Sequence, residues 1–408
     1  MKRTLLVVIF VTMKMSLGLA PDAQAQSQAP IKIGASAGLT GVYAEFGLAL
    51  QRGYQLCVKA ANAKGGLLGR KLEMTLVDDK SDTAAAVAIY ERLITQDKVD
   101  LVFSPYSTPM TDAVAAVTDK HGKPMVACCA ATPAIFKKGR RLFMLLTPAE
   151  GYLEGLIDIA AKRGLKSLVV IYEDTPFPKG IAQGAAELAK KRGLQVVALE
   201  GYPRGTKDFK EILAKFKTAN PDVIAAAAYY EDTVAITRDL KELDINPKML
   251  AATVGSGFPK FFETLGKSAE YVYGASPWEA GLVNMRAGGL IPIARQYPGA
   301  AEFVEAYRKE FGSDDMAYQT AQAYGACQLT LEGVKRAGAL DGEKIRAEIA
   351  KNETPTTFGA FRLSADGVQI GHKILLFQWQ DGKKAIVWPD EIAPQGPRFP
   401  TPAWSKRP

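Results

Sequence analysis

The sequence predicts an α/β protein built from parallel sheets and crossover helices. From Ile31 onward, short β-rich runs alternate with segments of helical periodicity, which is typical of βαβ units. Most of these runs are continuously apolar, as strands buried on both faces of a sheet are. Several helical segments end at glycines that can close a helix in a left-handed turn: Gly65, Gly122, Gly164 and Gly193. With 408 residues, the chain is long enough for more than one lobe of this kind.

The expected elements follow one another along the first part of the chain. Apolar runs predict strands at 31–36, 71–77, 101–104, 125–128, 167–172, 195–200, 223–228 and 271–275. Helical periodicity predicts helices at 44–63, 83–94, 109–122, 151–163, 180–192, 208–217 and 233–243. In 208–217, for example, one apolar stripe at helical spacing is formed by Phe209, Ile212, Leu213 and Phe216.

After Trp278 the pattern becomes mostly helical. Helices are expected at 300–311, 317–336 and 342–350, and short strands around 357–363 and 373–380. The end of the chain is rich in proline, which disfavours helices and central strands. We expect residues 386–408 to form an extended tail over the surface.

The N-terminus resembles a secretory signal peptide. Lys2 and Arg3 precede an apolar run at 5–13, and Ala23-Gln24-Ala25 offers the small residues that signal peptidase requires. The apolar run is too short for a membrane-spanning helix. No cysteine lies near the cleavage point, so no lipid anchor is expected. Residues 1–25 are therefore interpreted as a cleaved signal peptide, and the mature chain as a diffusible periplasmic protein.

The four cysteines allow two interpretations. In an oxidising compartment an even number of cysteines could pair. However, Cys57 and Cys327 lie in helix-like segments, and Cys128 and Cys129 end an apolar strand. We interpret the cysteines as buried free thiols.

Histidine is scarce and the net charge is modest. His121 and His372 are the two histidines, which disfavours histidine-rich metal sites and most histidine-based acid–base chemistry. The net charge of +8 comes from 51 Lys and Arg against 43 Asp and Glu. Because no nucleic-acid motif accompanies this excess, no nucleic-acid partner is expected.

Two signatures of enzyme sites are missing from the sequence. It contains no GxxxxGK[ST] phosphate loop and no histidine pair at metal spacing. Asp78, Asp79 and Asp82 could suggest a metal site, but an acidic turn that caps the next helix is the favoured interpretation. We expect neither catalysis nor a cofactor or metal.

The strongest candidate for a binding loop is Ser104-Pro105-Tyr106-Ser107-Thr108-Pro109. In open α/β sheets, ligands bind beyond the carboxyl ends of the strands, where helix N-termini present free N–H groups. Thr108 suits the N-cap and Pro109 the first helical position, so N–H groups and two hydroxyls would converge there. Such a loop could bind a carboxylate, although plain helix capping explains it as well.

Three further loops follow predicted strands. Small residues from Cys129 through Ala130 and Ala131 to Thr132 would allow a ligand close to the backbone. The other two loops place aromatic rings beside acidic groups, Phe177 near Glu173 and Tyr229 near Glu231. Aromatic faces of this kind could enclose a ring or an organic cation, or could simply be buried.

Several motifs together resemble the branched-chain amino acid binding protein family, the type I periplasmic binding proteins that serve ABC importers. They are Ile31-Lys32-Ile33-Gly34 through Leu39-Thr40-Gly41, the stretch from Asn62 to Leu72 (NAKGGLLGRKL), Asp78-Asp79 and Ser107-Thr108. The resemblance extends from about Ile31 to Gly382.

This resemblance implies two Rossmann-like lobes with parallel sheets, joined by a three-segment hinge that closes on one ligand. Lobe 1 would comprise 26–147 and 279–357, and lobe 2 would comprise 148–278 and 358–385. The implied function is that of a periplasmic binding protein that captures a small carboxylate-bearing solute, an amino acid or an aromatic or keto acid. Its partners would be that solute and the membrane permease of an ABC transporter, and the protein would be a monomer.

The family's binding positions transfer to individual residues of this chain. Its carboxylate-binding loop corresponds to Ser107 and Thr108, next to Tyr106, and its second anchoring turn to 129–132. Its aromatic positions correspond to Phe46, Phe177 and Tyr229. The cysteines that form a disulfide in some members correspond to Ser81 and Ser107, so that bridge is absent.

One departure from the family bears on the ligand. The acidic residue that pairs with the ligand ammonium corresponds to Val254, which cannot do so. An ammonium enclosed without a partner would cost several kcal/mol. Either Glu231 or Asp232 replaces the acidic residue, or the ligand carries no ammonium.

Two alternatives belong to other classes of protein. A ligand-sensing protein of the same fold would present its ligand to a separate receptor. A secreted α/β enzyme would need a nucleophile paired with a base, and the sequence offers no such pair.

Overall fold

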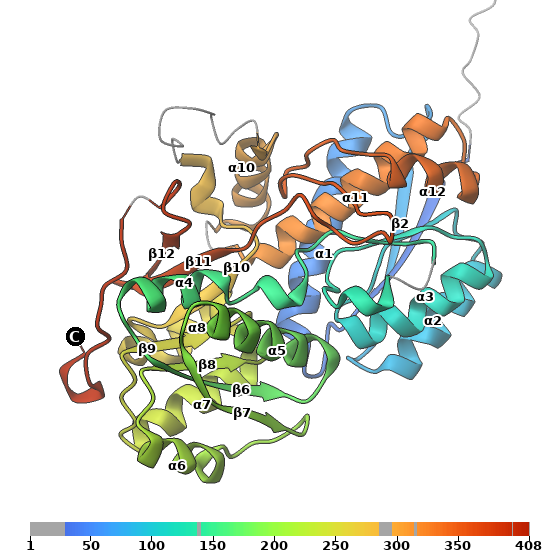
Figure 1. Cartoon of the computed structure of the whole chain (residues 1–408). Helices are drawn as coiled ribbons and strands as arrows, with labels where there is room; N and C mark the ends of the chain where they lie inside the picture. The colour runs from blue at the N-terminus through green and yellow to red at the C-terminus, as the bar shows by residue number, and fades with distance from the viewer. Residues whose placement is uncertain (1–28, 137–139, 285–295, 314–315, 394, 408) are drawn as a thin grey trace, which may run out of the picture.

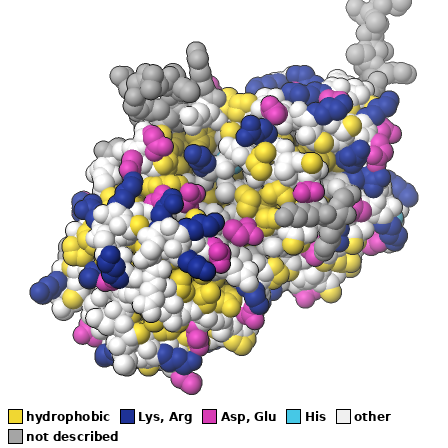
Figure 2. Space-filling model, viewed as in Figure 1, with side chains coloured by type: hydrophobic (Ala, Val, Ile, Leu, Met, Phe, Trp, Pro, Cys, Tyr) yellow, Lys and Arg dark blue, Asp and Glu magenta, His cyan; other side chains and the backbone are white. Residues whose placement is uncertain are grey.

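The computed structural model describes residues 29–136, 140–284, 296–313, 316–393 and 395–407, which form two α/β lobes (Figure 1). The predicted signal peptide lies outside the described residues. Within the described ranges, no helix has both the length and the apolar character needed to cross a membrane. On the face shown in Figure 2, Lys and Arg side chains are interspersed with Asp and Glu. The excess of positive charge therefore forms no single patch on that face.

The first lobe is built on short parallel strands. A three-stranded sheet has the order β2-β1-β3, with the bounds β1 Ile31–Ala37, β2 Leu72–Asp78 and β3 Leu101–Val102. A parallel pair consists of β4 Met125–Ala127 and β5 Leu142–Met144. The helices of this region are α1 Ala44–Ala63, α2 Thr83–Thr95 and α3 Thr108–Lys120. A parallel bridge between Tyr106 and Cys129 joins the ends of β3 and β4, so the loops that follow these strands meet.

The second lobe contains a seven-stranded sheet in the order β12-β11-β10-β9-β8-β6-β7. Its strands are β6 Ser167–Glu173, β7 Gln195–Tyr202, β8 Val223–Ala227, β9 Met249–Ala252, β10 Tyr273–Ser276, β11 Leu375–Gln380 and β12 Lys383–Trp388. Its helices are α4 Glu154–Lys162, α5 Pro176–Lys191, α6 Lys210–Ala219, α7 Tyr230–Glu242 and α8 Pro259–Leu265. Strands β6 to β10 pair in parallel, whereas β11 and β12 are antiparallel to their neighbours. The parallel pairing predicted from the sequence is therefore found in β6 to β10. It does not extend to β11 and β12, the antiparallel strands at one edge of the sheet, which come late in the chain.

Three later helices are α10 Ala300–Phe311, α11 Tyr318–Ala337 and α12 Gly342–Ala350. Helix α11 packs along α1, although the two are far apart in sequence (Figure 1). Gly53 of α1 makes this close approach possible, because a Cβ there would clash with the carbonyl oxygen of Thr320. Helix α12 packs on α11, and the chain then leads to β11 in the second lobe.

A disulfide between Cys57 and Cys327 joins α1 to α11. The interpretation of these two cysteines as free thiols was therefore wrong. Each lies in a helix, as expected, but the two helices are neighbours in the fold, and the sequence pattern did not indicate that. Cys128 and Cys129 are buried free thiols, as predicted.

Most elements agree with the sequence-based expectations, with some exceptions. The helices at 44–63, 300–311 and 342–350 have the expected bounds. The short strands expected around 357–363 are wrong, because that region contains only isolated bridges, Thr356 to Gly359 and Leu363 to Gln369. Strands β5, β9 and β12 and helix α8 were not predicted. The acidic turn was interpreted correctly, since the Asp82 carboxylate accepts a hydrogen bond from Ala85 N–H at the start of α2.

The C-terminal segment was only partly anticipated. Residues 386–388 belong to β12 and not to the tail. Further on, the chain is attached to the second lobe through Trp404, whose indole N–H donates to the Ile245 carbonyl. The Thr401 amide likewise donates to the Lys248 carbonyl. The end of the tail is therefore held against the second lobe by buried contacts.

Candidate functional site

The two loops expected to hold a carboxylate are hydrogen-bonded to each other. The Thr108 hydroxyl oxygen accepts from the Ala131 amide at 3.3 Å and lies 3.4 Å from the Thr132 hydroxyl. Deeper in the lobe, the Ser104 hydroxyl oxygen accepts from the Cys128 amide at 2.9 Å. These bonds fix the loop after β3 against the loop after β4.

Ser107 has an unusual backbone conformation at the start of α3. It is the N-cap residue, with φ 75° and ψ 152°, a backbone conformation that residues other than glycine rarely adopt. Its carbonyl accepts from the Thr111 amide, but its side chain makes no capping bond. The sequence had placed the N-cap at Thr108, which is instead the first helical residue. The Ser107 hydroxyl therefore does not cap α3.

The Ser107 hydroxyl is buried and has no hydrogen-bond partner among the described residues. The Tyr43 hydroxyl is near it, yet no hydrogen bond joins the two. A buried hydroxyl without a partner costs about 1–3 kcal/mol. A strained residue that carries an unpartnered polar group at a cleft is typical of a ligand-binding position.

Ser107 faces a small cavity between the lobes, which we call the interlobe cavity. It is lined by Tyr106, Ser107, Cys129, Leu146, Tyr152, Phe177, Tyr229, Val254, Tyr318 and Gln322. Its volume is about 10 Å³, no more than one water molecule needs. A solute can therefore be accommodated only if the lobes separate or the lining side chains move.

Aromatic rings from both lobes interlock beside this cavity. Phe46 stacks on Tyr106 with ring centroids 4.5 Å apart, and it meets Phe258 of the second lobe edge-on at 4.8 Å. Tyr229 lies edge-on to Tyr43 at 5.3 Å. Ring contacts of this kind add to the stability of the closed arrangement beyond the area that they bury.

Two charged side chains also bridge the lobes. Lys260 of α8 forms an ion pair with Glu45 of α1. The guanidinium of Arg204 lies over the ring of Tyr43, 4.7 Å from its centroid. These two contacts join the lobes, and separation of the lobes would break them.

Glu173 and Asp232 are two buried acidic residues of the second lobe. Burial raises the pKa of Glu173, whose carboxylate accepts from the Thr175 hydroxyl at 2.8 Å. Burial also raises the pKa of Asp232, which accepts from the Tyr202 hydroxyl at 2.9 Å. Neither residue lines the interlobe cavity. Both carboxyl groups therefore have protein partners and do not face the cavity.

Half of the residues proposed from the sequence line the cavity: Tyr106, Ser107, Cys129, Phe177, Tyr229 and Val254. The other six do not line it. The Thr108 hydroxyl joins the two loops through its contacts with Ala131 and Thr132. Ala130 is buried, and Phe46 is buried in the aromatic cluster. Glu231 is half-exposed and forms an ion pair with Lys207 at 3.0 Å. Glu231 is thus not placed to meet a ligand in this cavity.

Four lining residues were not identified from the sequence. Leu146 and Tyr152 lie in the connection after β5, a strand that was itself not predicted. Tyr318 and Gln322 lie in the first turns of α11, one helical turn apart. Their i, i+4 spacing is the one feature of the sequence that could have indicated them. It shows that the two side chains share a helix face, but not what that face contacts.

Two α/β lobes that close on a small cavity beyond the carboxyl ends of their strands define a solute-binding protein of the two-lobe type. The comparison with known families agrees, since a model of the periplasmic binding protein family matches residues 30–384. The chain belongs to this family, whose members bind solutes without transforming them.

Curated and solved relatives cover nearly the whole chain. A Leu/Ile/Val-binding protein homologue from Brucella abortus is 25% identical over 95% of this chain and 98% of its own. The leucine-binding protein LivK from Thermotoga maritima has a TM-score of 0.77 at 23% identity, covering 89% of this chain and 98% of LivK. LivJ from Streptococcus pneumoniae, solved with isoleucine, has a TM-score of 0.77 at 25% identity, with 88% and 100% covered. The type I periplasmic binding protein fold predicted from the sequence is thereby confirmed.

A fourth similar structure was solved with a different ligand. It is a solute-binding protein of an ABC transporter from R. palustris, in complex with benzoate. Its TM-score is 0.73 at 18% identity, with 92% of this chain and 97% of that chain covered. This degree of similarity establishes a shared fold.

Proposed function

We propose that this chain is the periplasmic solute-binding component of an ABC importer and captures a small carboxylate between its lobes. The observation that carries the proposal is Ser107, with its strained backbone and its buried, unpartnered hydroxyl at the interlobe cavity. A carboxylate oxygen would accept a charge-assisted hydrogen bond from that hydroxyl. Isoleucine and benzoate, the ligands named for two similar structures, both carry a carboxylate.

The lining of the cavity favours a ligand without an ammonium group. Among the described residues, no Asp or Glu lines it, and Val254 occupies the position that the resemblance assigns to the acidic partner. The rings of Phe177 and Tyr229 offer apolar surface to the rest of the solute. An aromatic or keto acid therefore suits the cavity better than an amino acid does.

The mechanism is capture by closure without chemistry. With the lobes apart, the first lobe would present Ser107, and the second would then bring Phe177 and Tyr229 over the bound solute. Lys260 would pair with Glu45 only on closure, and a closed outer surface is what a membrane permease would recognise. In this proposal the protein acts as a monomer and delivers its solute to that permease.

A thermal-shift panel tests this function. It compares carboxylic acids with their primary amides, and leucine with 4-methyl-2-oxopentanoate, the keto acid that has the same side chain. At a fixed ligand concentration, a ligand that binds more tightly raises the melting temperature more. We expect acids to stabilise and amides not to, and the keto acid to stabilise more than leucine. If no carboxylate stabilises the protein, the proposed function is wrong; if leucine is the best ligand, the preference against an ammonium is wrong.

A further inference from the structure

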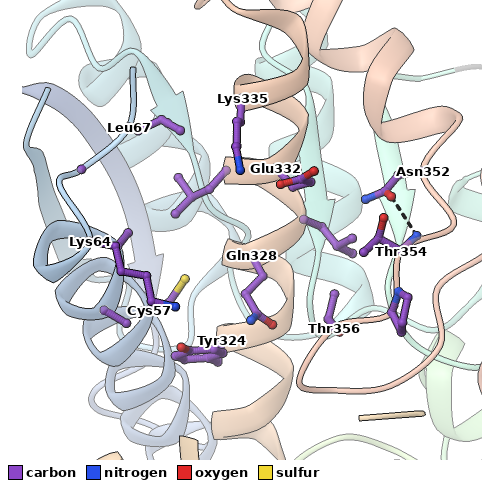
Figure 3. Close-up of a pocket in the computed structure, with 16 residues that line it drawn as sticks. Cys57, Lys64, Leu67, Tyr324, Gln328, Glu332, Lys335, Asn352, Thr354 and Thr356 are labelled. Carbon is purple, nitrogen blue, oxygen red and sulfur yellow. Dashed lines mark hydrogen bonds between the residues drawn. The ribbon is translucent and has the colours of Figure 1, made fainter. Parts of the chain in front are cut away.

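A second, larger pocket lies on the first lobe, away from the interlobe cavity. We call it the lysine pocket; its volume is about 490 Å³, within the range of small-molecule sites. Its walls come from α1, α11 and the segment after α12, with Lys64 and Lys335 among the lining residues (Figure 3). Gln322 lines the interlobe cavity and Glu332 this pocket. At 1.5 Å per residue, the two are roughly 15 Å apart along α11.

Helix α11 presents one polar face to the lysine pocket. Gln328, Glu332 and Lys335 lie on this face at i, i+4 and i+7 (Figure 3). Lys64, at the end of α1, extends toward α11 from the opposite wall (Figure 3). Both lysines are exposed at the pocket, and neither forms an ion pair with another described residue. Glu332 already pairs with Arg336 at 2.8 Å, so the pocket has an excess of positive charge.

Asn352 supplies a buried polar atom without a partner. The residue is 2% exposed, and its amide nitrogen has no hydrogen-bond partner among the described residues. Its side-chain oxygen accepts from the Thr354 amide at 2.8 Å, which fixes the orientation of the side chain. In Figure 3 the amide nitrogen points to the side on which Glu332 lies, toward the pocket. A donor buried without a partner costs free energy unless a ligand or water satisfies it.

We propose that the lysine pocket binds a small organic dianion of the dicarboxylate class. Lys64 and Lys335 would each pair with one carboxylate, and the Asn352 amide would donate to the same ligand. Leu67, Leu331 and Pro355 would contact its carbon skeleton. This site goes beyond the proposed transport function, because it uses no residue of the interlobe cavity.

Calorimetric titration of the mature protein with succinate tests the site, with succinamide as the neutral counterpart. We expect succinate to bind and succinamide not to. The variant Lys64→Ala/Lys335→Ala should weaken succinate binding by about tenfold or more, because two charge-assisted contacts are lost. Asn352→Asp should weaken it similarly, since it keeps the oxygen that accepts from Thr354 but replaces the donor with a negative charge.

Two controls locate the binding. Lys344→Ala removes a lysine from α12 outside the pocket and should leave succinate affinity unchanged. Ser107→Ala removes the carboxylate anchor of the interlobe cavity and should leave unchanged the succinate binding that Lys64→Ala/Lys335→Ala removes. The proposal is overturned if succinate does not bind, if the double lysine variant binds it as wild type does, or if Ser107→Ala abolishes binding. Melting curves of each variant show whether it is folded.

Discussion

At the scale of single residues, Ser107 carries the most information about function. Its backbone strain costs about 1–3 kcal/mol in a folded protein, and its hydroxyl lacks a partner. Both costs are borne at a position that faces the interlobe cavity. Strained backbone and unpartnered polar groups are typically found where ligand binding requires a particular side-chain orientation.

Substitutions at Ser107 separate these two costs. Ser107→Ala keeps the strain and removes the hydroxyl, so we expect carboxylate affinity to fall by about tenfold or more. Ser107→Gly also removes the hydroxyl but relieves the strain, so it should bind as weakly and melt at a higher temperature than Ser107→Ala. Calorimetry and melting curves measure the two effects. Wild-type affinity in both variants would exclude Ser107 as the anchor.

The sequence indicated the loop at the interlobe cavity but not which of its residues faces that cavity. The run Ser107-Thr108-Pro109 predicts a helix start and two hydroxyls, and it suggested Thr108 as the cap. The backbone at Ser107 shifts the helix start by one residue, which turns the Ser107 side chain to the cavity and Thr108 toward Ala131. A positive φ at a serine arises from the surrounding fold, so the local sequence does not predict it.

At the scale of elements, the contact between α1 and α11 organises the first lobe. Gly53 permits the close approach, and the bond between Cys57 and Cys327 locks it. A disulfide suits an oxidising compartment such as the periplasm. The prediction that both cysteines lie in helices was correct, but their pairing depends on which helices are neighbours in the fold.

Reduction of the disulfide should destabilise the protein. The bond closes a loop between residues 270 apart in sequence, and its loss should cost about 2–5 kcal/mol. We expect a lower melting temperature with dithiothreitol and in Cys57→Ala/Cys327→Ala. Dithiothreitol should have no further effect on that variant, which leaves Cys128 and Cys129 intact. An unchanged melting temperature on reduction would contradict a structural role for the bond.

The connection from α12 to β11 contains a buried histidine. His372 stacks on Phe358 with ring centroids 4.7 Å apart, and its Nδ1 lies 2.9 Å from the Thr147 hydroxyl. Burial lowers the pKa of His372 to about 4. In the unfolded chain a histidine has a pKa of about 6.5. The unfolded state therefore binds a proton first as the pH falls.

This difference predicts a loss of stability on the acid side. The free energy of unfolding should be highest above pH about 6.5 and should fall as the pH drops toward about 4. In His372→Gln the loss over this window should be smaller, because the substituted side chain does not titrate. Denaturant titrations at several pH values measure it, with His121→Gln as the matched control. The same acid loss in His372→Gln as in wild type would contradict the assignment.

At the scale of the whole molecule, the fold was predictable and the closed state was not. Continuous apolar runs indicate strands, because strands buried on both faces of a sheet need apolar residues throughout. Apolar stripes at helical spacing, such as Phe209 to Phe216, indicate the helices between them, and their alternation indicates the α/β architecture. Contacts across the cleft, such as those of Phe46 with Phe258 and Lys260 with Glu45, join segments far apart in sequence. No local pattern predicts those pairs.

The central claim is that a carboxylate binds at Ser107 between the lobes, and a crystal structure of the complex tests it most directly. The ligand used is the acid that gives the largest thermal shift. We predict one carboxylate oxygen within hydrogen-bond distance of the Ser107 hydroxyl and the remainder of the solute between Phe177 and Tyr229. A carboxylate found outside the interlobe cavity, or inside it without contact to Ser107, would contradict the account.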